Sequence, residues 1–476
     1  MNTDSLTIEN FEDYFRSISE IVFRYRDNLN QEPLLPSIGY SDLYQLLYEE
    51  MPYHGVAIEK LLIDVQDKII PNSSKIGHPR FLAWMNNAGS DAGVLGDLIN
   101  IGLNQVPFMY KAGPAATVIE DVVIQWMGQL FGYCGDFGGT FVSGGTTANL
   151  ISLLVAREAK TDNTMVNGIA ADTKLLLYVS EQGHATIERA IGILGIGTKN
   201  IRKIPTDSQF RMDIAALERQ IEEDVSNHYQ PFCIVAQGGS ATVGAVDPIA
   251  DIASICKRYN VWLHVDAAYG GAAMLVKEKR PLFQGIECAD SITVDPHKWF
   301  YVPIEAGLVL VKNKEQLFDT FTTTSCKAYK GNNAEKNFLD YGLQLARTSR
   351  ALKVWFAFKT YGFEKIGKCV AQNIMLANEL KVRFANEPHW EILNPVDLSI
   401  VCLRYRPDSV SDMDRINDLQ GVILNKVMES GKAFLTPATV NNKNGIRICF
   451  ANHRTSLEDV AVLHELLISI AGSLKL

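Results

Sequence analysis

The chain has 476 residues, 47% of them hydrophobic and 21% charged, with a formal net charge of −9, a composition typical of a globular protein with two or three domains. The acidic balance argues against nucleic acid or an anionic membrane as a partner. The N-terminus lacks a signal-peptide pattern, no apolar run approaches the roughly 18 residues of a membrane span, and the eight cysteines form neither a C-x-x-C pair nor a zinc spacing, so a reduced cytoplasmic setting without a metal site is expected.

The first part of the chain predicts helices alone. Residues 10–29 carry apolar side chains at helical spacing behind Asn10, a candidate N-cap, and residues 56–70 and 91–103 are also predicted to be helical. This leading segment has apolar faces but no strand pattern. We therefore expect it to pack on a partner rather than to fold by itself.

From about residue 140 onward, short apolar strands alternate with helices. Strands are predicted at 175–179, 232–236, 261–265, 291–294 and 307–311, and helices at 147–160, 185–194, 213–224 and 248–258. Strands rich in Val, Ile and Leu suit a mostly parallel sheet that helices cover on both faces. In such sheets, ligands bind beyond the carboxyl ends of the strands.

A long helix is predicted at 345–361, ended by Gly362. A smaller α+β region follows, with strands at 398–404 and 446–450 and a last helix at about 456–472. The predicted division is a helical segment at 1–88, a large α/β domain at 89–362 and a small C-terminal domain at 363–476.

Three polar motifs follow predicted strands, and each has a structural alternative. The small residues Ser143-Gly144-Gly145-Thr146 open a predicted helix, where free N–H groups suit a phosphate, although a glycine turn before a helix is usually structural. His184 fits either a surface or capping position or a place against a ligand ring. Ser240 lies in a loop that either contacts a ligand oxygen or simply leads to a helix capped by Asp247.

Two further residues carry a stronger signal. Asp266 ends the apolar stretch Val261-Trp262-Leu263-His264-Val265, where a buried carboxylate needs a cationic partner. Lys298 follows in Asp295-Pro296-His297-Lys298-Trp299. Pyridoxal phosphate (PLP) forms an imine with a lysine amine and requires a carboxylate to keep its ring nitrogen protonated. The pair therefore predicts PLP, and a structural salt bridge of Asp266 is the alternative.

In their order along the chain, these motifs resemble the group II PLP-dependent amino acid decarboxylases, most closely the aromatic-L-amino-acid decarboxylase branch. The resemblance covers roughly residues 10 to 472 and rests on the segments around Phe81, Thr146, His184, Ser240, Asp266 and Lys298. It implies the aspartate-aminotransferase-like fold type I, with an N-terminal helical segment, a mostly parallel seven-stranded sheet and a small C-terminal α+β domain. It also implies a homodimer with active sites at the subunit interface.

The resemblance assigns roles to single residues. Lys298 corresponds to the imine lysine and Asp266 to the partner of the ring nitrogen, with Ala268 and His184 on opposite ring faces. Ser240 matches a position near the 3′ oxygen, and His297 belongs to the lysine motif. The implied phosphate cradle is Gly144, Gly145 and Thr146. The implied substrate pocket is Phe81, Trp84 and Phe108, of which Phe108 is expected to reach the partner's site.

Two positions depart from the family pattern or fit it loosely. Asp295 stands where some relatives have an asparagine that binds phosphate, a role that a carboxylate does not suit. Thr322 begins a stretch that matches a mobile loop whose tyrosine protonates the product carbanion, and Tyr329 is its counterpart here, displaced by a residue or two. Some relatives with phenylalanine at that position release aldehydes.

The sequence thus favours decarboxylation of an aromatic L-amino acid to the amine and CO₂. A decarboxylase of a non-aromatic amino acid, or a decarboxylating aldehyde synthase on the same scaffold, is the alternative. A PLP-binding protein without turnover is a third hypothesis, which the retention of His184, Asp266 and Lys298 argues against. The choice among aromatic substrates stays open, and Asn86 and Asn87 are candidates either for binding ring hydroxyls or for capping a helix.

Overall fold

The computed structural model of the chain describes residues 6–31, 33–322 and 335–474. Its centre is a seven-stranded sheet in the order β1-β7-β6-β5-β4-β2-β3. Strand β7 pairs antiparallel with both of its neighbours, and the other pairs are parallel. The bounds are β1 Gly138–Val142, β2 Leu175–Ser180, β3 Ile201–Ile204, β4 Gln230–Gln237, β5 Trp262–Asp266, β6 Ser291–Val294 and β7 Gly307–Val311. The mostly parallel sheet of fold type I is confirmed.

Helices cover both faces of this sheet, as the alternation of strand residues requires. In β2, Leu175, Leu177 and Val179 belong to one buried cluster, whereas Leu176 and Tyr178 belong to another. The first cluster lies under α6 (Gly145–Lys160), α8 (Ala185–Ile193) and α11 (Lys314–Phe321). The second lies under α5 (Pro114–Leu130), α9 (Ile214–Ser226), α10 (Ile249–Tyr259) and α12 (Arg350–Ala385).

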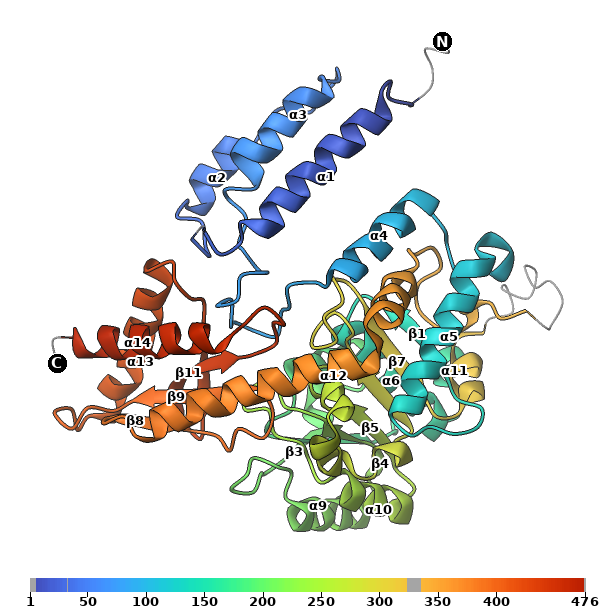
Figure 1. The fold of residues 1–476 in the computed structure, drawn as a ribbon. Helices are drawn as coiled ribbons and strands as arrows, with labels where there is room; N and C mark the ends of the chain where they lie inside the picture. The colour runs from blue at the N-terminus through green and yellow to red at the C-terminus, as the bar shows by residue number, and fades with distance from the viewer. Residues whose placement is uncertain (1–5, 32, 323–334, 475–476) are drawn as a thin grey trace.

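A second sheet of four antiparallel strands forms the C-terminal region, in the order β10-β11-β9-β8. Its strands are β8 Trp390–Ile392, β9 Ile400–Tyr405, β10 Thr436–Val440 and β11 Lys443–Cys449, with helices α13 (Met413–Glu429) and α14 (Leu457–Gly472). Helix α12 runs from the large sheet to this region (Figure 1). Gly362 breaks the helical backbone of α12 with φ 66° and ψ 160°, and a second helical stretch follows at once. The predicted domain boundaries at 88 and 362 stay predictions.

The N-terminal helices form an arm that stands apart from the rest of the molecule (Figure 1). They are α1 (Phe11–Asp27), α2 (Tyr40–Leu47) and α3 (Ile58–Asp64), and α4 (Asp91–Leu103) follows on the main body. The helical expectation for these stretches is confirmed. The proposed Asn10 cap is wrong, because Asn10 has a left-handed backbone and its side chain makes no capping hydrogen bond.

The sequence missed two strands of the large sheet and gave one wrong helix cap. The five predicted strands are present, but β1, which holds two glycines, and the four-residue β3 lack a clear apolar pattern and were not predicted. The predicted Asp247 cap is also wrong: its carboxylate accepts hydrogen bonds from the N–H groups of Met212 and Gln237 instead. In the described part of the chain, no helix has the length and apolarity needed to cross a membrane.

Candidate active site

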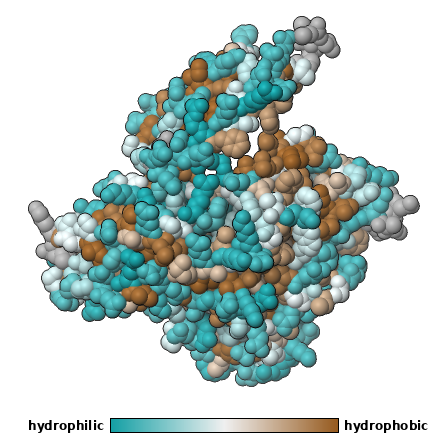
Figure 2. Space-filling view, viewed as in Figure 1, coloured by the Kyte–Doolittle hydropathy of each residue, from teal (hydrophilic) through white to brown (hydrophobic). Residues whose placement is uncertain are grey.

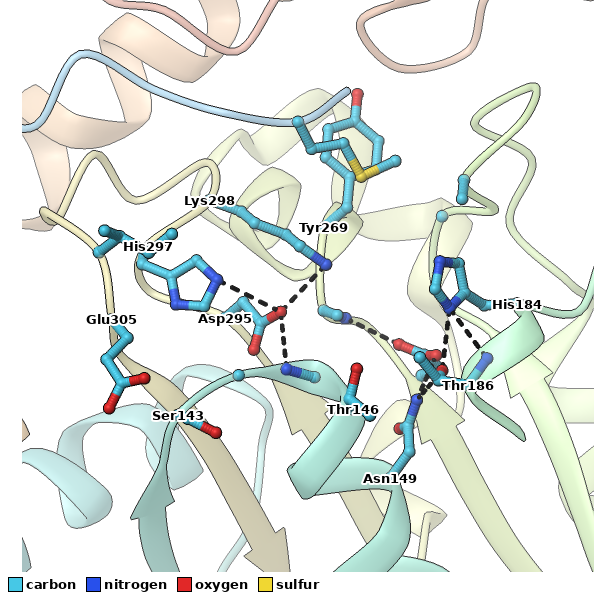
Figure 3. A pocket seen from close by; sticks show the side chains of 18 of the residues that line it. Ser143, Thr146, Asn149, His184, Thr186, Tyr269, Asp295, His297, Lys298 and Glu305 are labelled. Carbon is cyan, nitrogen blue, oxygen red and sulfur yellow. Dashed lines mark hydrogen bonds and ion pairs between the residues drawn. The ribbon is translucent and has the colours of Figure 1, made fainter. Parts of the chain in front are cut away.

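A cavity of about 580 Å³ opens at the carboxyl edge of the large sheet. The lining residues come from the ends of several strands, because β1, β2, β4, β5 and β6 all end at this edge. Figure 3 shows Lys298 entering from one side and His184 standing on the other. Of the predicted site residues, the lining includes Gly144, Gly145, Thr146, His184, Asp266, Ala268, His297 and Lys298. Residues more than a hundred positions apart in sequence are therefore neighbours here.

Asp266 is the last residue of β5 and only 7% of it is exposed. Its Oδ2 accepts a hydrogen bond from Nδ2 of Asn149 at 2.8 Å, and its Oδ1 accepts one from the N–H of Ala268 at 3.2 Å. Both oxygens of the Asp266 carboxylate thus accept hydrogen bonds from groups of the protein. The carboxylate can therefore serve as the counter-charge of a protonated ring nitrogen.

Lys298 lies in a turn after β6, where its N–H donates to the carbonyl of Asp295. Asn87 braces this turn, because its Nδ2 donates to the carbonyls of Lys298 and Val302 at 2.8 and 3.2 Å. The Asn87 amide is thus committed to the backbone and neither binds a substrate hydroxyl nor caps a helix. The sequence offered no signal for this brace, which joins positions more than 200 residues apart.

The amine of Lys298 is 3.0 Å from Oδ2 of Asp295. Burial by itself lowers the pKa of the amine, but the charges of Asp295 and Asp266 outweigh it, and the pKa is raised above its ordinary value. In this state Lys298 is an ammonium and must lose its proton before it can act as a nucleophile. Asp295 is the obvious acceptor by distance.

Asp295 also lies at the start of α6, where it accepts a hydrogen bond from the N–H of Gly145 at 3.0 Å. The carboxylate is almost fully buried, at 1% exposed, and its second oxygen has no hydrogen-bond partner within the described residues. Asp295 takes an N–H group that a phosphate would otherwise use. Its observed contacts are those of a counter-ion for Lys298, a role that the sequence did not suggest.

The remaining features of this wall fit a phosphate-bearing coenzyme. A Cβ added at Gly144 would lie 3.0 Å from the ring of His297, and one at Gly145 would lie 2.9 Å from Asp295 and 3.4 Å from Ala268. Helix α6 begins here and directs its N-terminal end at the cavity, a favourable place for an anion. Within the described chain, the buried Nε2 of Gln237, another residue of the lining, has no hydrogen-bond partner. A donor left unsatisfied in a cavity suits a polar ligand.

His184 caps helix α8, since its Nδ1 accepts from the N–H of Thr186 at 3.3 Å and lies 2.9 Å from the Thr186 hydroxyl. Burial lowers the pKa of His184, so the ring is neutral at pH 7. His184 therefore caps a helix and also lines the cavity, so the two interpretations of this residue are compatible. A neutral imidazole can stack on an aromatic ring without introducing a second cation.

The side chains of two other predicted cofactor residues, His297 and Ser240, accept hydrogen bonds from backbone N–H groups close in sequence. His297 accepts a hydrogen bond from the N–H of Ala306 through Nδ1, and burial lowers its pKa. Ser240 is fully buried and its hydroxyl accepts from the N–H of Ala245, while its neighbours Gly239 and Ala241 line the cavity. Contact of Ser240 with a coenzyme oxygen stays a prediction.

Two of the predicted substrate residues, Phe81 and Trp84, lie beside the cavity rather than in its wall. Phe81 and Trp84 pack with Phe434, with ring centroids 5.2 to 6.1 Å apart, and the adjacent Met85 lines the cavity. Trp84 has a left-handed backbone, φ 51°, and Arg447 donates to its carbonyl at 3.0 Å. Phe108, whose carbonyl accepts from the N–H of Leu339, is absent from the lining within the described chain, as are Phe81 and Trp84.

Sequence reasoning missed several residues of this site. Asn149 and Thr186 line the cavity, and they follow Thr146 and His184, which the sequence had singled out, by three and two residues. Asn149 lies one helical turn beyond Gly145, so it faces the same side of α6, and this spacing could have revealed it. Tyr329 and its loop lie outside the described residues. Within those described, no group of three or more His, Cys, Asp or Glu side chains is placed to hold a metal ion.

A lysine amine and a buried carboxylate at the same sheet edge, beside a glycine-lined helix start, place the chain among the PLP-dependent enzymes of fold type I. The family follows from comparison with known sequences. The model of the pyridoxal-dependent decarboxylase conserved domain matches residues 41–406. The chain belongs to this family of carboxy-lyases, and PLP is its cofactor.

Several of the similar proteins are named for aromatic amino acids or for an aromatic aldehyde. The chain is 34% identical over 444 residues to the aromatic-L-amino-acid decarboxylase of Bacillus atrophaeus, which covers 93% of this chain and 91% of the relative. It is 28% identical over 467 residues to 4-hydroxyphenylacetaldehyde synthase of Rhodiola rosea, covering 96% and 94%. Among solved structures, tryptophan decarboxylase of Catharanthus roseus in complex with L-tryptophan superposes with a TM-score of 0.91 at 26% identity, covering 99% of this chain and all of that one.

Proposed function

We propose that this chain decarboxylates an aromatic L-amino acid to the corresponding amine and CO₂. The observation that carries the proposal is the convergence of Lys298 and Asp266 on one cavity. Bound PLP supplies an electron-accepting ring that stabilises the negative charge left at Cα when CO₂ departs. The protein must then hold the coenzyme, orient the substrate and control protons.

We propose that residues on both sides of the cavity hold the coenzyme. Lys298 would attach the coenzyme through its amine, and Asp266 would keep the ring nitrogen protonated. Ala268 and His184, which both line the cavity, would lie against opposite ring faces. The phosphate would meet the N-terminal end of α6 at Gly144, Gly145 and Thr146, beside His297. Asp295, which pairs with the lysine ammonium, gains its proton when the amine becomes the nucleophile.

A proton must also reach Cα after CO₂ leaves. Tyr329 is the proposed donor, from the loop that begins at Thr322. A loop that closes over the cavity would exclude water and protect the charged Cα from side reactions. The proposal rests here on the sequence match alone.

The aromatic preference is supported by the cluster of Phe81, Trp84 and Phe434 next to the cavity. Aromatic rings favour one another through offset and edge-to-face packing. Trp84 is 54% exposed in the single chain, so a substrate ring or a second subunit has access to it. The names of the relatives point the same way.

The direct test is a CO₂-release screen of the purified, PLP-loaded protein across the amino acids. We expect release from one or more of tyrosine, dopa, tryptophan, hydroxytryptophan and phenylalanine. Release only from acidic or aliphatic amino acids would contradict the aromatic proposal while leaving decarboxylation intact. PLP binding without CO₂ release from any substrate would favour the hypothesis of a binding protein without turnover.

An aldehyde synthase is the second candidate, because a relative with that activity covers nearly the whole chain. A tyrosine in the loop favours the amine, since its proton quenches Cα. Ammonia and hydrogen peroxide measured beside CO₂ separate the two outcomes. We expect the wild type to yield amine, and Tyr329→Phe to shift the product toward aldehyde. Pure amine from Tyr329→Phe at the wild-type rate would mean that another group delivers the proton.

We further propose a homodimer with active sites at the interface. Helices α1, α2 and α3 contribute no buried residue in the single chain. Figure 2 shows apolar residues gathered on this arm and over α4, where Leu95, Leu98, Ile99, Ile101 and Leu103 are exposed. Apolar surface on this scale is typical of an obligate interface. Light scattering after size-exclusion chromatography measures the mass of the assembly directly. A monomer at micromolar concentration would refute the proposed homodimer.

A cytoplasmic location is proposed from the cysteines. The seven that the structure describes are all free, and four of them are buried. Free thiols suit a reducing compartment. Fractionation of the producing cells with a marker for each compartment tests this.

A further inference from the structure

Behind Asp266 a chain of hydrogen bonds runs through the interior of the large domain. His264 and Asp266 lie two residues apart on β5 and therefore point to the same face of the sheet, toward α6. Asn149 on α6 meets both, with Oδ1 3.0 Å from Nε2 of His264 and Nδ2 2.8 Å from Oδ2 of Asp266. All three residues are at least nine-tenths buried.

The chain continues on the far side of His264. Its Nδ1 lies 2.9 Å from the hydroxyl of Ser291, and the indole N–H of Trp262 donates to the same hydroxyl at 2.8 Å. Ser291 and His264 are completely buried, and Trp262 is 2% exposed. Solvent is therefore excluded as a source or sink of protons along this path.

The direction of each hydrogen bond follows from Asp266. Its Oδ2 accepts from the NH₂ group of Asn149, so the carbonyl of Asn149 faces Nε2 of His264. His264 must then carry its proton on Nε2. Burial lowers the pKa of His264 to about 4, so the ring is neutral and its Nδ1 is an acceptor. Ser291 donates to that atom and accepts from Trp262, and every donor in the chain has a partner.

Asn149 has a second arm. Its Nδ2 also lies 3.2 Å from the hydroxyl of Thr186, and that hydroxyl lies 2.9 Å from Nδ1 of His184. Thr186 accepts from Asn149 and donates to His184, which places the remaining His184 proton on Nε2. One amide therefore touches the carboxylate at the ring nitrogen and, through Thr186, the imidazole at the ring face (Figure 3).

We propose that Asn149 is a positioning residue that aligns Asp266 and His184 together, and that buried His264, protonated on Nε2, locks the amide in the one orientation that serves both. This inference rests on the proposed function for the roles of Asp266 and His184. A flipped amide would turn its carbonyl toward the Asp266 carboxylate and its NH₂ away from it. Repulsion between these two groups would displace Asp266 and weaken coenzyme binding. Lys298, the residue proposed to bind the coenzyme covalently, would be unaffected.

The first test uses the wild-type protein without coenzyme. Nitrogen-15 NMR of labelled histidines reports which ring nitrogen bears the proton, and the missing signal in His264→Gln assigns His264. We expect a neutral ring with its proton on Nε2 at pH 7. A proton on Nδ1, or a doubly protonated ring, would overturn the proposal without reference to any activity.

The second test compares two variants by their equilibrium dissociation constant for PLP. His264→Gln keeps an N–H donor near the Nε2 position, whereas His264→Leu removes it at a similar volume. We expect His264→Leu to bind PLP at least about tenfold more weakly and His264→Gln to stay within about threefold of the wild type, because a lost hydrogen bond that orients a charged group has an effect of that order. Equal affinities of all three proteins, or equal losses in both variants, would overturn the proposal.

A folding defect is kept apart from the positioning effect by a milder variant. Ser291→Ala removes the hydroxyl that donates to Nδ1 and accepts from the Trp262 indole but leaves Asn149 and Asp266 in place, so we expect the His264 proton to stay on Nε2 and PLP affinity to fall less than in His264→Leu. A proton on Nδ1 of His264 in Ser291→Ala, with PLP affinity equal to that of the wild type, would contradict the proposal. If the wild type bound PLP and released no CO₂, the proposed function would fail while the tautomer result stood; a wrong tautomer with normal CO₂ release would refute this inference alone.

Discussion

The cavity and the N-terminal arm differ in whether their side chains find contacts within a single chain. At the cavity and behind it, Asp266, Asn149 and His264 are buried, and Asn149 is hydrogen-bonded to both of the others. On the arm, Phe11, Phe15, Ile18 and Val22 form a stripe along α1 at helical spacing, and each is at least 41% exposed. The residues of the first region contact one another within the chain, whereas the apolar stripe of the second is exposed in the single chain.

This difference suggests that coenzyme binding and substrate specificity depend on different parts of the protein. The residues that would hold the coenzyme are preorganised by the fold of one subunit, which lowers the cost of binding. The proposed substrate residues are less enclosed, because Trp84 is 54% exposed and Phe108 is not among the described residues that line the cavity. Coenzyme binding is therefore expected to depend on the interior of the chain, and substrate specificity on the dimer as well.

The largest effect is expected from Lys298→Ala. Without the amine the coenzyme has no covalent attachment, so turnover should fall on the order of 10⁴-fold, and the visible absorbance of the attached coenzyme should vanish. Absorbance spectra and the CO₂ assay measure this, and circular dichroism checks that the fold persists. An unchanged spectrum would reject the assignment of Lys298.

A smaller loss is expected from Asp266→Asn. The amide still fits between Asn149 and Ala268 but no longer holds a proton on the ring nitrogen, so PLP is retained while turnover falls roughly 10²- to 10³-fold. PLP content and CO₂ release are measured on the same preparation. Near-normal rates would contradict the role of the ring as an electron acceptor. Together with Lys298→Ala, this variant sharpens the claim that the interior of one chain performs the chemistry.

Acid should weaken the interior through His264. Its pKa is about 4 in the fold and about 6.5 in the unfolded chain, so the unfolded state binds the extra proton first. Stability is fully present above pH 6.5 and declines as the pH falls toward 4, by on the order of 3 kcal/mol for this residue. Urea unfolding of the wild type and of His264→Gln across pH 4–7 measures the difference. Parallel pH curves for the two proteins would show that the ring is not held neutral by burial.

The arm is tested by charge. Phe15→Asp with Val22→Asp places two carboxylates on the exposed stripe of α1 and should raise the dimer dissociation constant about tenfold or more. Ser17→Asp, off the stripe on the same helix, is the matched control and should leave it unchanged. Sedimentation measures association in each case. An unaltered dimer in the double variant would break the contrast between a self-contained interior and a partner-dependent arm.

The sequence predicted the regular parts of this fold well. Strands β2, β4, β5, β6 and β7 carry continuous apolar runs, and their boundaries agree with the prediction to within about two residues. It failed where contacts over long sequence distances decide the outcome. Asp247 resembles a helix cap, yet its carboxylate binds Met212, 35 residues earlier, and Asn87 braces a turn beyond residue 290. Such partners have no local signature.

By itself, the sequence determined the apolar periodicities, the motif around Lys298 and the carboxylate at the end of a strand, because these depend on residue type and spacing along the chain. Only the tertiary structure decided that Asp295 pairs with Lys298 and that one amide on α6 joins Asp266, His264 and Thr186. A hydrogen bond depends on distance and direction between two atoms. The packing of α6 on the sheet sets both, and no property of either residue alone specifies them.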